Sequence, residues 1–230
     1  MIQKQFKKAN IDLTDEQAQK LALMSDFLLE YNQKVNLTAI KTPQEIAEKH
    51  FVDSVLPITM VDIPEGARCA DIGTGAGFPA LPMMIYRPDL RFTLVDALQK
   101  RTVYLQEISS KLAISPEILH SRAEELGQDA RYRGHYDMVT ARAVSDLATL
   151  AEYCLPLLKK GGIFLAMRGS TKELTPHHEQ VFEMLGGKLK QEKEYSLPCG
   201  DGRRLLIIEK VGETPKRYPR TAAQMKKAPL

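Results

Sequence analysis

Apolar residues recur at helical spacing in the first part of the chain, and each run follows a helix-start signal. A capping box begins at Thr14, and the apolar positions behind it are Leu21, Met24, Leu28 and Tyr31. This pattern predicts a helix over residues 15–32. A second start signal at Thr42, with proline at the first helical position, predicts another helix to about residue 60.

Farther along the chain, short apolar runs alternate with helical stretches. The runs that predict strands are residues 68–72, 91–95, 117–120, 136–141 and 162–168. The helical stretches between them begin near Phe78, Leu98, Arg122 and Leu147. Such alternation is typical of a parallel sheet covered by helices on both faces. After a helix near residues 176–185, two runs over 187–197 and 203–211 flank a glycine-rich turn, which predicts an antiparallel hairpin.

The first predicted strand ends in an acid and a glycine-rich loop, made of Asp71, Gly73, Gly75, Gly77 and Phe78. Glycines allow a sharp turn from strand to helix and leave no Cβ in the way of a ligand. A second acid, Asp96, ends the next strand 21 residues after Gly75. There a carboxylate can accept both hydroxyls of a ribose. The pattern therefore predicts a site for a nucleoside cofactor.

The loop favours S-adenosylmethionine over NAD. A dinucleotide loop usually has the spacing Gly-x-Gly-x-x-Gly, whereas the third glycine here comes one residue early. Asp71 would repel a pyrophosphate but attract an ammonium and a sulfonium. We therefore predict an α/β, class I (Rossmann-like) methyltransferase fold: a mostly parallel seven-stranded sheet, an antiparallel C-terminal hairpin and an N-terminal helical cap. An NAD(P)-dependent oxidoreductase with a variant glycine loop is the alternative.

Length and composition fit one globular domain. The 230 residues are 43% hydrophobic and 27% charged, and we divide them into a cap (1–62), a cofactor-binding core (63–212) and a basic tail (213–230). No apolar run is long enough to span a membrane, and the N-terminus lacks a signal peptide, so we expect a cytoplasmic monomer. The three cysteines are widely separated, which predicts free thiols and no metal site.

The net charge of +3 is unevenly distributed. The last 18 residues carry one acid and five basic residues, which are Lys216, Arg217, Arg220, Lys226 and Lys227. A basic tail beside such a core predicts contacts with the phosphates of a nucleic acid. We expect further contacts from a basic rim at Lys100, Arg101 and Arg203, and from Lys4, Lys7 and Lys8 at the other terminus.

The segment after the fourth strand indicates which atom is methylated. Residues 140–144 contain no acid, amide or proline to hold an amino group, and Cys199 lies in a turn and is not expected to act as a nucleophile. A lone-pair acceptor such as N7 of guanine fits better, because it has no proton to lose. Arg142 could hold guanine O6 or the carboxylate of the cofactor. His50 and Asp53, spaced i, i+3, are expected to make a structural contact.

Several motifs together resemble the ribosomal RNA small subunit methyltransferase G family, also called glucose-inhibited division protein B. They are residues 36–38 (Asn-Leu-Thr), 50–54 (His-Phe-Val-Asp-Ser), the glycine loop over 71–79, Lys100-Arg101, Arg122-Ala123-Glu124 and Arg142-Ala143. The resemblance implies N7 methylation of one guanosine in bacterial 16S rRNA, with naked rRNA or the 30S subunit as partner. It also implies cofactor contacts from Gly73, Phe78, Ala123, Glu124, Asp96 and Arg142. An RNA-associated protein that binds the cofactor without activity is a further alternative.

Overall fold

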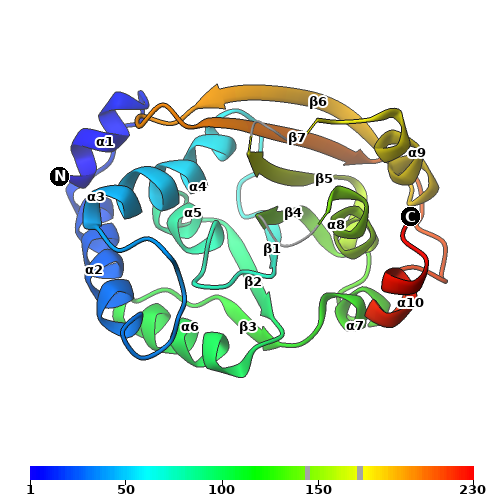
Figure 1. The fold of residues 1–230 in the computed structure, drawn as a ribbon, viewed down its shortest axis with the longest axis horizontal. Helices are drawn as coiled ribbons and strands as arrows, with labels where there is room; N and C mark the ends of the chain where they lie inside the picture. The colour runs from blue at the N-terminus through cyan, green and yellow to red at the C-terminus, as the bar shows by residue number, and fades with distance from the viewer. Residues whose placement is uncertain (143–145, 170–172) are drawn as a thin grey trace.

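Seven strands form one twisted sheet in the computed structural model, which describes residues 1–142, 146–169 and 173–230 (Figure 1). The strands are β1 (Arg68–Ile72), β2 (Arg91–Asp96), β3 (Glu117–His120), β4 (Tyr136–Arg142), β5 (Leu158–Gly169), β6 (Gly187–Ser196) and β7 (Gly202–Lys210). Their order is β3-β2-β1-β4-β5-β7-β6, and β7 runs antiparallel to both β5 and β6. Both the predicted parallel sheet and the predicted hairpin are confirmed. The largest difference is in β5, which begins four residues before the predicted run because Leu158 pairs with Tyr136 ahead of a register shift.

Helices cover both faces of this sheet (Figure 1). They are α1 (Ile2–Lys8), α2 (Asp15–Tyr31), α3 (Pro43–Ile46), α4 (Asp53–Val55), α5 (Ala80–Tyr86), α6 (Gln99–Lys111), α7 (Ala123–Gln128), α8 (Leu147–Cys154), α9 (Pro176–Met184) and α10 (Ala222–Lys227). The predicted capping box of α2 is present, because Thr14 and Gln17 each bond the backbone N–H of the other. Helices α1 and α10 are short and rich in lysine, and the apolar pattern does not predict them.

The second predicted helix is helical throughout, but it changes its turn type. Between α3 and α4 the backbone forms a wider π-helical turn over Ala47–Val52, and after α4 it tightens into a 3₁₀ turn over Leu56–Thr59. A π turn within a helix often marks a functional site. This one carries Lys49 and His50 and is directly followed by Asp53.

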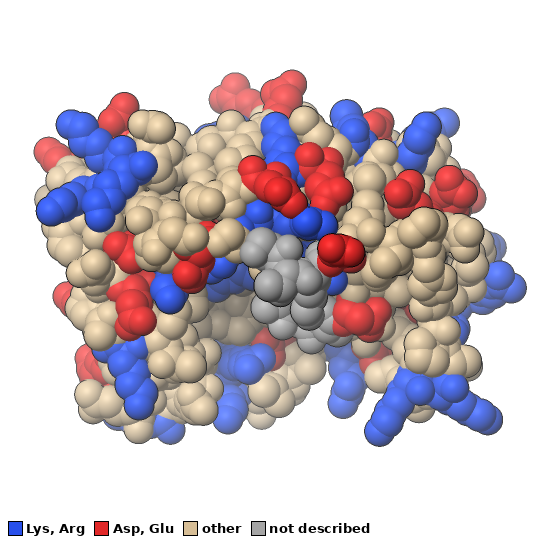
Figure 2. Space-filling model, turned by 45° about the horizontal axis from the view of Figure 1, so that its top comes forward, with Lys and Arg blue, Asp and Glu red and all other residues tan. Residues whose placement is uncertain are grey.

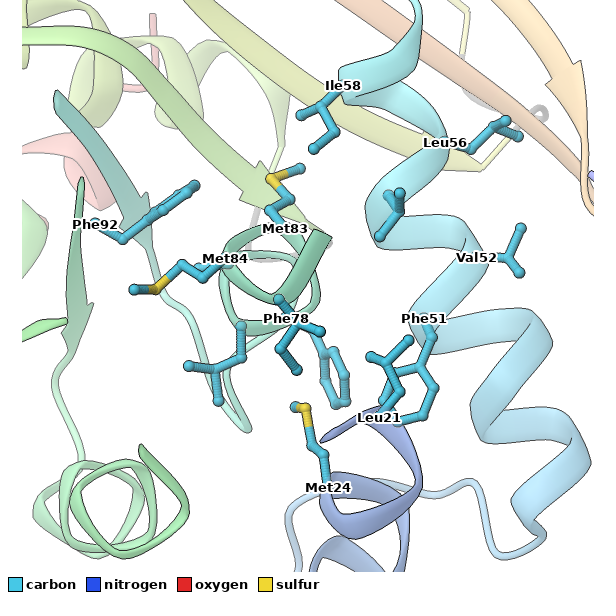
Figure 3. Close-up of a cluster of buried hydrophobic side chains, with 14 of the residues drawn as sticks. Leu21, Met24, Phe51, Val52, Leu56, Ile58, Phe78, Met83, Met84 and Phe92 are labelled. Carbon is cyan, nitrogen blue, oxygen red and sulfur yellow. The ribbon is translucent and has the colours of Figure 1, made fainter. Parts of the chain in front are cut away.

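Two buried clusters hold the layers together. One joins the N-terminal helices to α5, α6 and one face of the sheet. Figure 3 shows its centre, where Leu21 and Met24 of α2 lie beside Phe51 and Phe78, and Met83 lies nearer Ile58. The other cluster lies on the opposite face, beneath α7, α8 and α9. The residues predicted as a cap are therefore part of the same core as the sheet.

The C-terminal segment packs against α7 and α8. Tyr218 is buried, and Arg133 donates to the carbonyl oxygens of Tyr218 and Thr214 at 2.7 and 2.8 Å. Arg220 makes a bidentate ion pair with Glu152, whose side chain is only 1% exposed. Arg220, which we expected to contact phosphate, is therefore already engaged by a buried carboxylate. The other four basic residues of the segment are exposed: Lys216, Arg217, Lys226 and Lys227.

Replacing Arg220 with alanine should lower the free energy of unfolding by about 3–5 kcal/mol, because Glu152 would keep a buried charge without its cationic partner. Denaturant unfolding of the variant and the parent chain measures this. Lys227→Ala, on the same segment but exposed, is the matched control and should change stability by less than about 0.5 kcal/mol. Equal losses for the two variants would show that the ion pair does not secure the segment.

Candidate functional site

Two cavities lie at the carboxyl edge of the parallel strands. The first, here the glycine-loop cavity, has a volume of about 450 Å³ and is lined by residues of the glycine loop together with Asp96, Arg101, Thr38, His50 and Arg142. The second, here the hairpin cavity, has a volume of about 410 Å³ and extends to Arg203 of β7. His50 and Arg142 line both. Ligands of open α/β sheets bind at this edge, where the chain order reverses between β1 and β4.

Another cavity, of about 560 Å³, lies at the opposite, amino edge of the strands. Its lining includes the first residues of β1, β2, β3 and β4 and none of the predicted site residues. Size alone therefore does not identify the site. The convergence of predicted residues favours the carboxyl edge.

The glycines of the loop have different structural roles. Gly73 and Gly75 have φ values of +69° and +60°, which L side chains rarely adopt, and both line the cavity. A Cβ on Gly75 would meet no atom closer than 4.0 Å, so its backbone is open to a ligand. Gly77, which we predicted to contact the cofactor, lies behind the loop. A Cβ there would collide with Leu81, so this glycine allows the helix to pack.

Asp96 organises the loop from the end of β2. Its carboxylate accepts hydrogen bonds from the backbone N–H of Gly75 at 3.0 Å and of Leu98 at 2.9 Å, and from Arg101 at 3.1 Å. The side chain of Asp96 is 3% exposed and lines the cavity. Arg101, predicted as part of an RNA-binding rim, is therefore part of the glycine-loop cavity, whereas Lys100 is exposed.

Asp71 is fully buried beneath the glycine loop. One carboxylate oxygen accepts from the hydroxyl of Thr140 at 2.9 Å, and the Thr74 hydroxyl and the backbone N–H of Ala80 lie near enough to stabilise the charged carboxylate. Burial raises the pKa of Asp71 to about 6. The hydroxyl of Thr74, in the loop above, is buried beside this carboxylate. A buried carboxylate is costly unless its charge is compensated, and a cation bound near this loop would stabilise the charged form of Asp71.

Arg142 connects the two cavities from the end of β4. Its guanidinium donates to Asp53 and to the carbonyl oxygen of Lys49, each at 3.3 Å, and to Nδ1 of His50 at 3.1 Å. It also lies 5.2 Å from the centre of the Phe78 ring. Only 15% of the Arg142 side chain is exposed. A cation held by so many contacts is fixed in position, as a group that orients a ligand must be.

His50 is a neutral member of this cluster. Its ring stacks on Phe78 at 4.3 Å, and burial together with the charge of Arg142 lowers its pKa to about 3. Because a guanidinium can only donate, Nδ1 of His50 accepts from Arg142, and Nε2 donates to the Thr38 hydroxyl at 2.9 Å. The expected contact between His50 and Asp53 is wrong. Both bond Arg142 instead, since the π turn changes how residues at this spacing face their surroundings.

The low pKa of His50 should appear in the pH dependence of stability. Because the folded-state pKa lies below the ordinary value of 6.5, the unfolded chain binds the proton first as pH falls. The contribution of His50 to the free energy of unfolding should therefore decrease below pH 6.5, by about 2 kcal/mol at pH 5. Denaturant unfolding of the parent chain and of His50→Asn, measured between pH 7 and 5, isolates this contribution. Parallel curves would contradict a buried, neutral His50.

Asp53 joins Arg142 to the hairpin cavity. Its carboxylate, 7% exposed, also accepts from Nε of Arg203 at 3.1 Å. The predicted rim of Lys100, Arg101 and Arg203 is therefore divided, because Arg203 lies in the hairpin cavity and Arg101 in the glycine-loop cavity. Lys49 and Arg168, which no sequence motif identified, line the hairpin cavity as well.

Thr38 reaches the glycine-loop cavity from the loop after α2. Asn32 holds this loop by accepting from the backbone N–H groups of Leu37 and Thr38 and by donating to the Thr38 carbonyl oxygen. Asn36, at the start of the same motif, is exposed. The Asn-Leu-Thr motif indicated the position of the loop, but Asn32 was missed, since a side chain that holds a loop five and six residues ahead follows no helix or strand period.

Ala123 and Glu124 begin α7 and line neither cavity. They follow the end of β3, where the backbone N–H of Ser121 donates to the Asp96 carbonyl oxygen at 3.2 Å. The Glu124 side chain is 11% exposed, with a carboxylate oxygen 3.9 Å from Arg122. The chain just before α7 therefore lies beside Asp96, which lines the glycine-loop cavity. Ala143 and Val144, which belong to the predicted acceptor segment, lie outside the described residues.

On the face that Figure 2 shows, the described basic residues do not form one continuous surface. Figure 2 shows Lys and Arg in separate groups among Asp and Glu. The group at the left lies at the end where Figure 1 places α1, whose exposed lysines are Lys4, Lys7 and Lys8. Lys216, Arg217, Lys226 and Lys227 lie on the C-terminal segment, on the opposite side of the sheet.

Other kinds of site find little support in the structure. Cys69 and Cys154 are buried, and Cys199 is exposed in the hairpin turn and lines neither cavity. Among the described residues, His, Cys, Asp and Glu side chains form no group of three that could hold a metal ion. In the same part of the chain, every helix is too short or too polar to cross a membrane.

Comparisons with known proteins agree on one family. The model of the family described as rRNA small subunit methyltransferase G matches residues 17–204. A protein of this name from Lactobacillus acidophilus is 42% identical over 231 aligned positions, which cover 98% of this chain and 96% of the relative. Another, from Acetivibrio thermocellus, is 43% identical over 222 positions, covering 96% and 91%.

Solved structures share the architecture at low sequence identity. A SAM dependent methyltransferase from Aquifex aeolicus has a TM-score of 0.54 at 14% identity, over 80% of this chain and 98% of the other. TrmN from Thermus thermophilus has a TM-score of 0.53 at 20% identity, over 72% and 53%. These likenesses confirm the predicted class I, Rossmann-like fold.

Proposed function

The chain belongs to the rRNA small subunit methyltransferase G family, and on this premise we propose that it methylates N7 of one guanosine in bacterial 16S rRNA. It is a methyltransferase, and the comparisons give no support to an NAD(P)-dependent oxidoreductase or to an inactive cofactor-binding protein. The partner is 16S rRNA, alone or within the 30S subunit, which also implies action in the cytoplasm.

The glycine-loop cavity is the proposed site for S-adenosylmethionine. Its volume of about 450 Å³ is in the usual range for a ligand of this size. The buried carboxylate of Asp71 beneath the loop fits a ligand that brings an ammonium and a sulfonium to the loop. Asp96 would accept from the ribose, and Ala123 and Glu124 would meet the edge of the adenine. Bound there, the cofactor supplies an electrophilic methyl group.

The proposal that N7 is methylated rests on the residues that line both cavities and form the wall between them. This wall consists of Arg142, a fixed cation, and His50, a neutral imidazole whose two nitrogens are both already hydrogen-bonded. Neither group is suited to remove a proton, and N7 of guanine has none to lose. The task left to these residues is positioning, which contributes strongly when two reactants must be aligned.

RNA contacts outside the cavities are proposed for the exposed basic residues: Lys100, Lys216, Arg217, Lys226 and Lys227, with Lys4, Lys7 and Lys8 of α1. These side chains would bind phosphates without reading sequence. Deleting the C-terminal segment would not test this role, since it would also unpair Glu152. Alanine at the exposed lysines alone removes charge and leaves the fold intact.

Two measurements test the proposed function. Calorimetry should show binding of S-adenosylmethionine and of its demethylated product, with no binding of NAD. Mass spectrometry should then find one new methyl group at N7 of a single guanosine after the enzyme acts on 16S rRNA or 30S subunits from a strain that lacks the gene. A methyl group on carbon or on an amino nitrogen, or binding of NAD alone, would overturn the proposal.

A further inference from the structure

The hairpin cavity is rich in hydrogen-bond donors. Four of its lining residues are cationic, and they are Lys49, Arg142, Arg168 and Arg203. Among the described lining residues Asp53 is the only carboxylate, and it bonds both Arg142 and Arg203. Lys49 pairs at 3.4 Å with Asp201, which does not line the cavity. His50 is neutral, and its ring nitrogens are taken. The cavity therefore presents an excess of N–H groups and positive charge to whatever enters it.

Arg203 has more of its five N–H hydrogens left to offer than Arg142 does. Its Nε donates to Asp53 at 3.1 Å and its Nη1 to the Gly202 carbonyl oxygen at 3.0 Å. Its Nη2 lies 3.8 Å from Asp201, beyond hydrogen-bond distance. Arg142, by contrast, already donates to three acceptors. The two contacts of Arg203 hold the guanidinium plane while one amino group stays available.

Arg168 offers a second unused donor. It lies on β5, opposite Arg204 of β7 in the sheet, and its Nη1 is buried with no hydrogen-bond partner in the described part of the chain. Burial and the nearby Arg204 lower the pKa of Arg168, and the charge of Asp146 only partly opposes them. An anion in the hairpin cavity would offset this repulsion.

We propose that the hairpin cavity binds the target nucleotide, with Arg203 selecting guanine over adenine by donating to O6 and Arg168 binding the phosphate. The proposal rests on the proposed function, because it assumes a purine acceptor beside the cofactor. On its N7 edge guanine has two acceptors, whereas adenine places an amino donor beside N7. A wall of donors therefore attracts guanine and repels adenine. With O6 held by Arg203, N7 remains open toward the wall shared with the glycine-loop cavity.

The test uses the full chain loaded with S-adenosylhomocysteine, and its probes are guanosine 5′-monophosphate, adenosine 5′-monophosphate and guanosine. The guanine nucleotide should bind on the order of tenfold more tightly than the adenine nucleotide. Arg203→Lys, which keeps the charge but loses the planar fork, should remove most of this preference. Arg168→Gln should weaken the nucleotide while leaving guanosine unchanged. Arg131→Gln, an exposed arginine paired with Asp129, is the control for lost charge.

S-adenosylhomocysteine binding confirms that each variant is folded. Equal affinity for the two nucleotides in the parent chain, or an unchanged preference in Arg203→Lys, would overturn the guanine assignment. An equal loss for guanosine and its monophosphate in Arg168→Gln would overturn the phosphate assignment. These failures are distinct from failure of the proposed function, in which the parent chain would not bind S-adenosylhomocysteine or methylate 16S rRNA.

Discussion

Replacing Arg142 with alanine is expected to lower kcat for 16S rRNA methylation by about 100-fold or more. Of the cations that the structure describes, Arg142 alone lines both cavities, and its loss releases His50 and Asp53 together. Small displacements of reacting groups have effects of this size. Arg142→Lys should also be strongly impaired, because an ammonium cannot reproduce the flat, multiply bonded guanidinium above Phe78. Single-turnover rates with saturating S-adenosylmethionine measure the effect.

Cys199→Ser is the control for the Arg142 variants, and its rate should equal that of the parent chain. The exposed Cys199 lines neither cavity, whereas methylation of a pyrimidine carbon would require a thiol nucleophile. A folded but inactive Cys199→Ser would refute the N7 proposal. Full activity in Arg142→Ala would show that Arg142 has no role in positioning.

Replacing Asp96 with alanine is expected to weaken S-adenosylmethionine binding by about 2–4 kcal/mol, or about 30- to 900-fold. The variant would lose the proposed ribose contacts and also the acceptor that holds the N–H of Gly75 and Leu98. Calorimetric titration measures the change. The carboxylate oxygens also accept hydrogen bonds from the loop, and Asp96→Asn keeps one side-chain oxygen. Asp96→Asn should therefore weaken cofactor binding less than Asp96→Ala does.

Asp89→Ala is the matched control for Asp96. Asp89 likewise accepts from a backbone N–H, that of Gly66, and from an arginine, Arg87, but it lines neither of the two cavities. Its variant should bind the cofactor as the parent chain does. Unchanged affinity in Asp96→Ala would remove this residue from the cofactor site.

The secondary structure was largely predictable from local patterns. Apolar runs identified the central strands β1, β2, β4 and β5 because buried parallel strands are apolar on both faces, whereas β6 and β7 were predicted from the turn between them. The capping box of α2 and the turn between β6 and β7 are also local signals, and both are found in the structure. Asp71, the glycines and Asp96 were recognisable for the same reason, since their spacing follows from one strand-loop-helix unit.

Tertiary structure decided which distant residues meet at the carboxyl edge. Arg142, the helical stretch with His50 and Asp53, and Arg203 belong to three separate segments, and no sequence spacing reports the contacts of Arg142 and Arg203 with that stretch. The same holds for Arg220, which charge alone assigned to phosphate and which Glu152 engages instead. A charged side chain pairs with the group that the fold places beside it. Burial favours this pairing further, because an unpaired charge costs more free energy away from water. The sequence by itself thus determined the fold and the glycine loop. The chain topology determined which residues meet in the wall between the two cavities.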